Sequence, residues 1–258
     1  GVGVSAPLTF TISGPLLNQG GIVNAASFTP GAAVAAGGIA TAFGAELAAA
    51  LATAGTLPLP TTLAGITVRM NNILAPLFLL NGSQINLQVP WELAGQSQAT
   101  VVATVGTTTL APVTVNLVNA APGIFTTNAQ GTGQGAILLS GTATFAAPNG
   151  SIPGAASRPA NRGEFVTIFC TGLGAVTNRP ASGAVGPPGP GLAQTTTSVS
   201  ITIGGIAATP SFAGLAPGFV GLYQVDVQIP ANVTPGSALT LTISVGGANS
   251  NSVTIAVQ

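Results

Sequence analysis

The chain has 258 residues, of which 3% are charged: it contains four Arg, four acidic residues, no His and one Cys. Nucleic acid requires a basic face, which this composition cannot supply, so a nucleic-acid partner is excluded. Zinc and iron sites of the usual kind require several His or Cys ligands, so we expect no metal and no cofactor. No apolar run is long enough for a membrane-spanning helix, so membrane insertion is not expected either.

The remaining composition indicates an all-β protein. Apolar residues make up 47% of the chain, aromatic residues only 5%, and there are 36 Gly and 20 Pro. Short alternating runs of Val, Ile, Leu and Thr favour strands, and the Gly and Pro between them mark turns.

Residues 1–21 form the first predicted segment, an arm that precedes the first domain. Every even position in residues 1–12 is apolar, and every odd position is Gly, Ser, Pro or Thr. Such alternation predicts an extended strand with one apolar face, about 40 Å long over twelve residues. The candidate subunit-assembly residues of this strand are Val2, Val4, Leu8, Phe10 and Ile12. Two interpretations stay open: the strand is donated to a neighbouring subunit, or it forms an edge strand of the first domain.

An internal repeat divides the rest of the chain into two predicted domains, residues 22–118 and residues 119–258. The matching segments are 38–43 with 164–169, 66–73 with 199–206, 85–90 with 225–230, 99–106 with 239–246, and 113–117 with 253–257. The second copy contains additional loop residues around 181–194 and 216–222. Six or seven short strands in each copy predict two tandem Ig-like β-sandwich domains.

Residues 45–53 are the only helical candidate. This segment is short and rich in Ala. Glu46 lies near its start, where the helix dipole favours a negative charge.

Several longer motifs resemble a known family, the C-terminal Ig-like domain of large secreted proteins from Solibacter-type acidobacteria. The motifs are GIVNAASF (21–28), SQINLQVPWE (83–92), AAPGIF (120–125), FVTIFCTGLG (165–174) and LAPGFVGLYQVDVQIP (215–230). The resemblance covers residues 22–258 and implies a secreted tandem β-sandwich. It implies no catalytic residues, since the family has no established activity. The family unit usually ends a long polypeptide, whereas here it follows a short arm.

The chain has few residues that support catalysis. Its carboxylates are Glu46, Glu92, Glu164 and Asp226. Glu164 and Asp226 fall in strands of the same domain, but no aromatic sugar platform accompanies this pair, as a glycosidase would require. Ion pairing with Arg158, Arg162 or Arg179 is the simpler interpretation of the acidic side chains. We therefore expect that the protein is not an enzyme.

Cys170, Trp91 and Tyr223 are the only residues of their types. Cys170 lies on the apolar face of a predicted strand, and no His is present to activate it, so a free, buried and inert thiol is expected. An intermolecular disulfide is the alternative. Trp91 is expected to cover the core, and sugar binding is the alternative, because one exposed aromatic residue makes a poor carbohydrate site.

The arm and the zero net charge predict a structural role. A net charge of zero promotes association, and an exposed amphipathic strand aggregates unless another chain pairs with it. Donation of this strand from one subunit to the next supplies backbone hydrogen bonds and produces fibres. The sequence thus predicts a secreted subunit that binds copies of itself in an extracellular filament or surface layer. The alternative is a non-catalytic carbohydrate-binding or adhesion module of a larger secreted protein, with surface glycans as partners.

Overall fold

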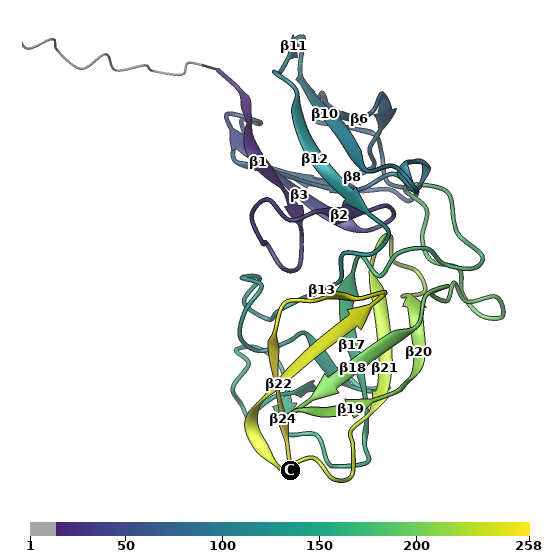
Figure 1. Cartoon of the computed structure of the whole chain (residues 1–258). Coiled ribbons are helices and arrows are strands. Elements are labelled where there is room, and N and C mark those ends of the chain that lie inside the picture. Colours follow the sequence, from purple (N-terminus) through teal and green to yellow (C-terminus); the bar gives the residue numbers. More distant parts are fainter. Residues whose placement is uncertain (1–13) are drawn as a thin grey trace, which may run out of the picture.

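Two pairs of β-sheets form the protein, and the computed structural model describes residues 14–258 (Figure 1). In the first domain, one sheet has the order β1 (Leu16–Asn24), β3 (Ile39–Ala45), β9 (Gln84–Gln88), β8 (Leu77–Leu80) and β4 (Ala52–Thr53). The other has the order β2 (Val34–Ala35), β12 (Val113–Val118), β10 (Gln98–Val105), β6 (Ile66–Met70) and β5 (Thr62–Leu63), while β11 (Thr108–Thr109) pairs with β10 and β7 (Ile73–Leu74) with β6.

The second domain repeats this arrangement. Its larger sheet has the order β16 (Ser157–Arg158), β15 (Phe145–Ala146), β14 (Ile137–Leu139), β17 (Phe165–Thr171), β21 (Tyr223–Gln228) and β20 (Pro210–Leu215), with β13 (Gly123–Ile124) paired to β17. The smaller has the order β19 (Ile206–Ala208), β18 (Val199–Ile203), β22 (Gly236–Val245) and β23 (Ala248–Asn249), with β24 (Val253–Val257) paired to β22. The prediction of two tandem Ig-like β-sandwich domains is confirmed.

Alternating burial explains why these segments form strands. In β12, Val113, Val115 and Leu117 are buried and the residues between them are exposed. Asn71 and Asn72 join β6 to β7 and both have positive φ, as a two-residue type I′ turn requires. A Gly-Gly turn occupies the equivalent place between β18 and β19.

The internal repeat extends to the strand register. Segments that match in sequence pair in the same way in both domains, residue for residue. The equivalent pairs are Ile39–Gln88 and Phe165–Gln228 in one sheet, and Ile66–Val105 and Val199–Val245 in the other. The two domains therefore have one common sandwich plan.

Residues 45–53 are not helical, so that prediction is wrong. The chain runs from the end of β3 through bends into β4, and the described residues contain a single short 3₁₀ helix, η1 (Trp91–Leu93). Glu46 has a φ of 53°, which a right-handed helix does not allow. Leu47 is fully buried, and its N–H donates to the carbonyl of Gly82 at 3.0 Å. Core burial of Leu47 thus overrides the helix propensity of the Ala-rich segment.

The first domain includes the C-terminal residues of the predicted arm, residues 1–21. Residues 16–21 were assigned to the arm, but they belong to β1, where Leu16 pairs with Ala45 and the buried Leu17 with Gly44. Residues 1–13 lie outside the described range, and with them the candidate assembly residues Val2, Val4, Leu8, Phe10 and Ile12. Donation of the arm therefore stays a prediction.

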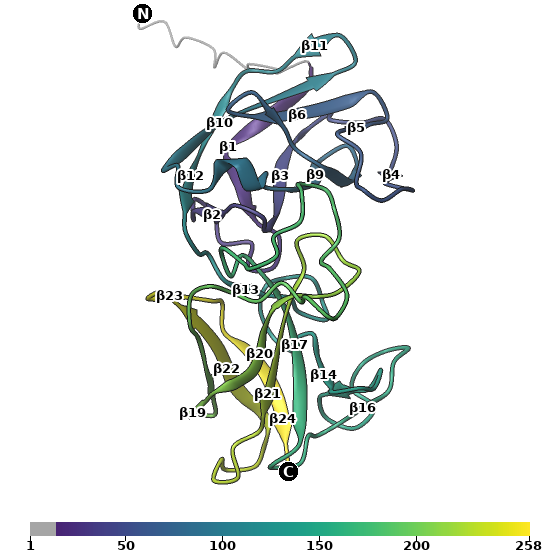
Figure 2. The same cartoon turned by 90° about the vertical axis from the view of Figure 1, so that its right-hand side faces the viewer.

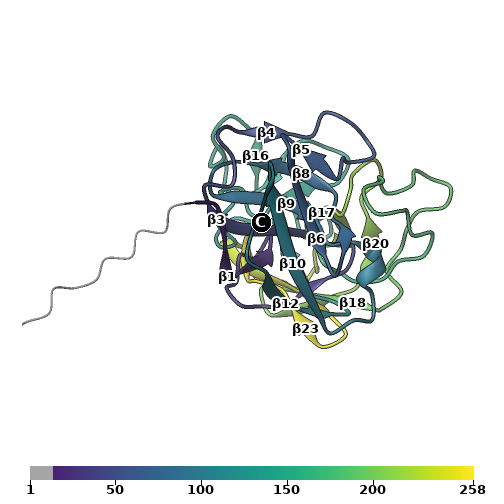
Figure 3. The ribbon, with the colours of Figure 1, turned by 90° about the horizontal axis from the view of Figure 1, so that it is seen from above.

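The two domains are stacked end to end (Figure 2), and seen from above the first covers the second (Figure 3). Trp91 connects them. It follows β9 of the first domain along the chain. Its side chain is 3% exposed and belongs to the core cluster of the second domain. Gly37 packs against the indole, since a Cβ there would lie 2.1 Å from the ring.

The additional loops of the second copy form much of the junction. Around the first loop, the N–H of Gly183 donates to Gln88 Oε1 at 2.7 Å, and its carbonyl accepts from Leu59 N–H at 2.8 Å. Ser182 accepts from the main-chain N–H of Trp91 and donates to Glu92 Oε2. These bonds fix the insertion of the second domain against the first.

Candidate functional site

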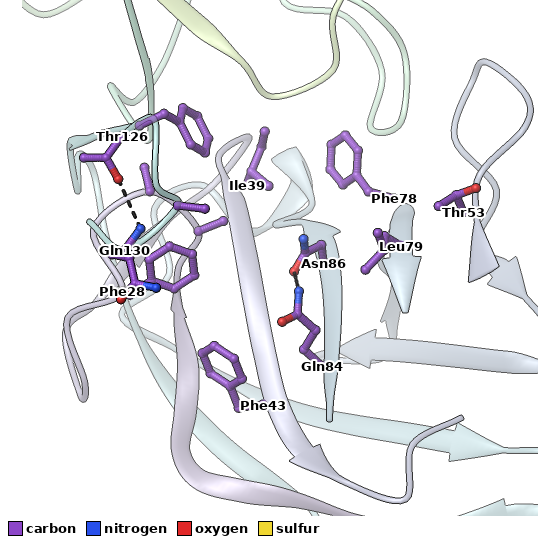
Figure 4. Close-up of a pocket in the computed structure, with 14 residues that line it drawn as sticks. Phe28, Ile39, Phe43, Thr53, Phe78, Leu79, Gln84, Asn86, Thr126 and Gln130 are labelled. Carbon is purple, nitrogen blue, oxygen red and sulfur yellow. Dashed lines mark hydrogen bonds between the residues drawn. The ribbon is translucent and has the colours of Figure 1, made fainter. Parts of the chain in front are cut away.

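A groove lies at the junction, on the outer face of the sheet that contains β3, β9 and β8 (Figure 4). Its volume is about 760 Å³, within the range of small-molecule binding sites. Both domains line it, and none of the lining residues within 14–258 is charged. We call it the aromatic groove after four of its lining residues, Phe28, Phe43, Phe78 and Phe125.

Three of these phenylalanines come from the first domain. Phe43 lies on β3 and Phe78 on β8, and β9 runs between these two strands. Phe28 follows β1 in a loop, with a φ of 53°. The ring centroids of Phe28 and Phe43 are 6.3 Å apart at a tilt of 45°, a favourable aromatic pair. All three side chains are half-buried, so part of each ring faces the groove.

Residues 125–130 of the second domain form one wall of the groove. Thr126 Oγ1 accepts hydrogen bonds from the main-chain N–H groups of Gln130 and Gly131, at 3.2 and 3.1 Å. Asn251 secures the same loop by donating to the carbonyls of Ile124 and Gly131. A Cβ at Gly131 would lie 2.4 Å from the carbonyl oxygen of Ser27, so glycine permits this close approach to the first domain. The wall is therefore held from both sides.

Uncharged polar side chains form the floor on β9. Asn86 Oδ1 accepts from Thr41 Oγ1 at 2.9 Å and from Gln84 Nε2 at 3.2 Å. No hydrogen bond within residues 14–258 uses Asn86 Nδ2 or Gln84 Oε1. The floor thus presents a free donor and a free acceptor toward the groove.

The second domain has the same polar pattern with a charge in it. Thr167 Oγ1 donates to Asp226 Oδ1 at 2.6 Å, and Gln224 Nε2 donates to Asp226 Oδ2 at 3.1 Å. Asp226 occupies the place of Asn86 in the repeat. Asp226 and Glu164 are engaged separately, since Glu164 pairs with Arg158 at 2.6 Å. This pair fits the predicted local ion pairing, and Arg158 is its cationic partner.

The ion pair lowers the pKa of Glu164 to about 2, mainly through the hydrogen bond from Arg158 and further through the N–H of Asn161. Burial raises the pKa of the Cys170 thiol, which is fully buried and free, as predicted. Burial also raises the pKa of Tyr223, whose hydroxyl donates to the carbonyl of Gly174 at 2.6 Å. Trp91 covers a core as predicted, but it is the core of the other domain.

The aromatic groove was not predicted. Its four phenylalanines are widely separated in the sequence, and an aromatic sugar platform was considered only beside Glu164 and Asp226. The only available signal was that one of them, Phe43, shares the outward face of its strand with Thr41, opposite the polar Gln84 and Asn86.

Two absences apply to residues 14–258. They hold no group of three or more His, Cys, Asp or Glu side chains that is placed to bind a metal ion. None of the helices in this part of the chain is long and apolar enough to cross a membrane.

No protein family and no curated protein matches the sequence. Among solved structures, the surface glycan-binding protein PbSGBP-B from Prevotella bryantii matches at 12% identity and a TM-score of 0.27, over 94% of this chain and 42% of that chain. Domains 5–6 of the S-layer protein SbsC match at 15% identity and a TM-score of 0.26, over 95% and 98%. The tandem Ig repeats of Dlar match at 12% identity and a TM-score of 0.22, over 95% and 97%. Likeness at this level supports no transfer of function.

Proposed function

We propose that the protein is a secreted structural subunit that self-assembles into an extracellular filament or surface layer. In this proposal the arm of one subunit, with Val2, Val4, Leu8, Phe10 and Ile12 on its apolar face, adds to a sheet of the next subunit. The resemblance to the acidobacterial Ig-like family supports the expectation of secretion.

The observation that carries the proposal is the locked junction between the two domains. Domains of one chain usually move relative to each other unless a large apolar interface prevents it. Here Trp91 is buried in the core of the second domain, and Gly183 bonds to both Gln88 and Leu59 of the first. A rigid two-domain block suits a subunit that must repeat at a fixed spacing.

The small number of charges and the zero net charge support self-association. The whole chain has four Arg and four acidic residues, and Arg158 and Glu164 neutralise each other. Net charge keeps soluble proteins apart, so its absence favours assembly. The inventory also supports a non-catalytic role, because the single thiol is buried and there is no His to act as a base.

Electron microscopy and sedimentation velocity of the full chain at neutral pH test the proposal. We expect filaments or sheets in the micrographs and rapidly sedimenting species in solution. A monodisperse monomer at all concentrations and salt conditions would contradict it. A chain without residues 1–12 is the comparison, and it is expected to stay monomeric and folded.

A further inference from the structure

We propose that the aromatic groove binds a neutral saccharide. The lining residues that the structure describes come from the two domains, so this proposal does not depend on self-assembly. It concerns a ligand that a surface-exposed subunit would meet from outside.

The aromatic rings supply surfaces for the apolar face of a sugar. Phe43 and Phe78 lie on the two strands that flank β9, so a ligand above β9 has a ring on either side (Figure 4). Phe28 extends the first of these surfaces through its contact with Phe43. A pyranose ring presents C–H groups on its faces, and these pack on aromatic rings as other apolar groups do.

The polar side chains match the hydroxyl rim of the same ligand. Asn86 Nδ2 and Gln84 Oε1 lie between the two aromatic walls and have no hydrogen-bond partner among residues 14–258. Thr126 Oγ1 accepts two main-chain hydrogen bonds, and no hydrogen bond within residues 14–258 uses its own hydrogen. Sugar hydroxyls both donate and accept, so they satisfy amide and hydroxyl groups alike.

The polar floor also distinguishes a saccharide from an apolar peptide. An apolar side chain over Asn86 and Gln84 would bury their free amide atoms without partners, which is unfavourable. A charged ligand finds no counter-ion among the described lining residues, because all of them are uncharged. A neutral ligand that combines apolar faces with hydroxyl groups meets both conditions.

Titration calorimetry of the full chain with neutral hexasaccharides tests the proposal, with cellohexaose, maltohexaose, xylohexaose and mannohexaose as probes. At least one is expected to bind, and Phe43→Ala and Asn86→Ala are each expected to weaken its Kd about tenfold. Phe165→Ala is the matched control: Phe165 is exposed on the same face of the equivalent strand, six residues from Thr171 at the junction. It is expected to leave the Kd unchanged.

Three outcomes overturn the proposal. The first is that none of the four hexasaccharides binds at millimolar concentration to a chain that melts cooperatively. The second is that binding is unaffected by Phe43→Ala and Asn86→Ala, which places it elsewhere. The third is that a peptide of residues 1–13 or an oligogalacturonate binds in the groove in preference to every neutral sugar, which assigns it to the arm or to an acidic ligand.

Discussion

The main-chain N–H of Ile39 in the first domain donates a hydrogen bond to Thr171 Oγ1 in the second, with 2.8 Å between the two atoms. The same hydroxyl donates to the carbonyl of Gly221, also at 2.8 Å. Thr171 is fully buried, so its side chain satisfies one main-chain group of each domain at the junction. This arrangement makes the junction sensitive to a change of a single atom.

Thr171→Val is therefore expected to destabilise the protein by about 1–3 kcal/mol, because it leaves the half-buried N–H of Ile39 and the buried carbonyl of Gly221 without partners. Denaturant unfolding measures the loss, and the amide of Ile39 should exchange its hydrogen faster. Thr202→Val, on an exposed position of β18, is the control and should change stability by less than about 0.5 kcal/mol. Equal effects of the two substitutions would show that the bond to Ile39 contributes nothing.

Gly37→Ala is expected to disrupt the packing of Trp91. The new Cβ would lie 2.1 Å from the indole, and Gly37 has a φ of +80°. Gly205 has a φ of +82° with no atom within 4 Å of a Cβ, so Gly205→Ala isolates the backbone strain, about 1–2 kcal/mol.

Thermal unfolding followed by the fluorescence of the single Trp compares the two variants. Gly37→Ala should lower the melting temperature more than Gly205→Ala does and shift the emission to longer wavelength. If both variants lose the same stability, the contact between Gly37 and Trp91 is not tight in solution.

The stability of the protein is expected to be constant between about pH 5 and 9 and to fall in acid. The pKa of Glu164 is about 2 in the folded state and lies near 4.3 in an unfolded chain. Its stabilisation is complete above about pH 4.3 and is lost as the pH falls toward 2. The Glu164–Arg158 pair is partly exposed, so the loss should be about 1 kcal/mol or less.

Melting temperatures from pH 2 to 9 check this expectation. Glu164→Gln should flatten the acid limb of this profile. A steep change within pH 5 to 9 would reveal another buried ionisable group.

The arm gives a prediction on assembly. If it is donated, Leu8, Phe10 and Ile12 fill a groove on the neighbouring subunit and contribute roughly 1.5–3 kcal/mol each. Phe10→Asp would then bury an unpaired charge and abolish filaments in electron micrographs. Thr9→Asp and Thr11→Asp, on the opposite face, should be milder.

A monomeric protein whose first domain unfolds when residues 1–12 are removed would contradict donation. The arm would then be an internal strand, which is the other interpretation of its pattern.

The sandwich plan was predictable because each strand carries its own signal. Alternation in β12 and the paired turn residues Asn71 and Asn72 are local features of the chain. The repeat added the division into two domains with one plan, since segments that match in sequence occupy equivalent places in the two copies. The prediction of a helix over residues 45–53 was wrong because Leu47 is buried in the core of the first domain. The local composition does not reveal this burial.

The aromatic groove was not predictable for a related reason. Phe43 and Phe125 meet only because the domains are docked, and docking depends on contacts such as Trp91 in the opposite core and Gly131 against Ser27. No sequence pattern within one domain indicates a contact with the other domain. A site between the two domains, such as the aromatic groove, is therefore not predictable from the sequence patterns of either domain.

The additional loops of the second copy make the two domains unequal at their junction. Two identical sandwiches joined by a linker could bend at the linker and could exchange places without loss. Here only the second copy has the loop that reaches Gln88 and Leu59, and only the first supplies Trp91 to its neighbour. The two domains therefore contribute different residues to their junction, although they have one common sandwich plan.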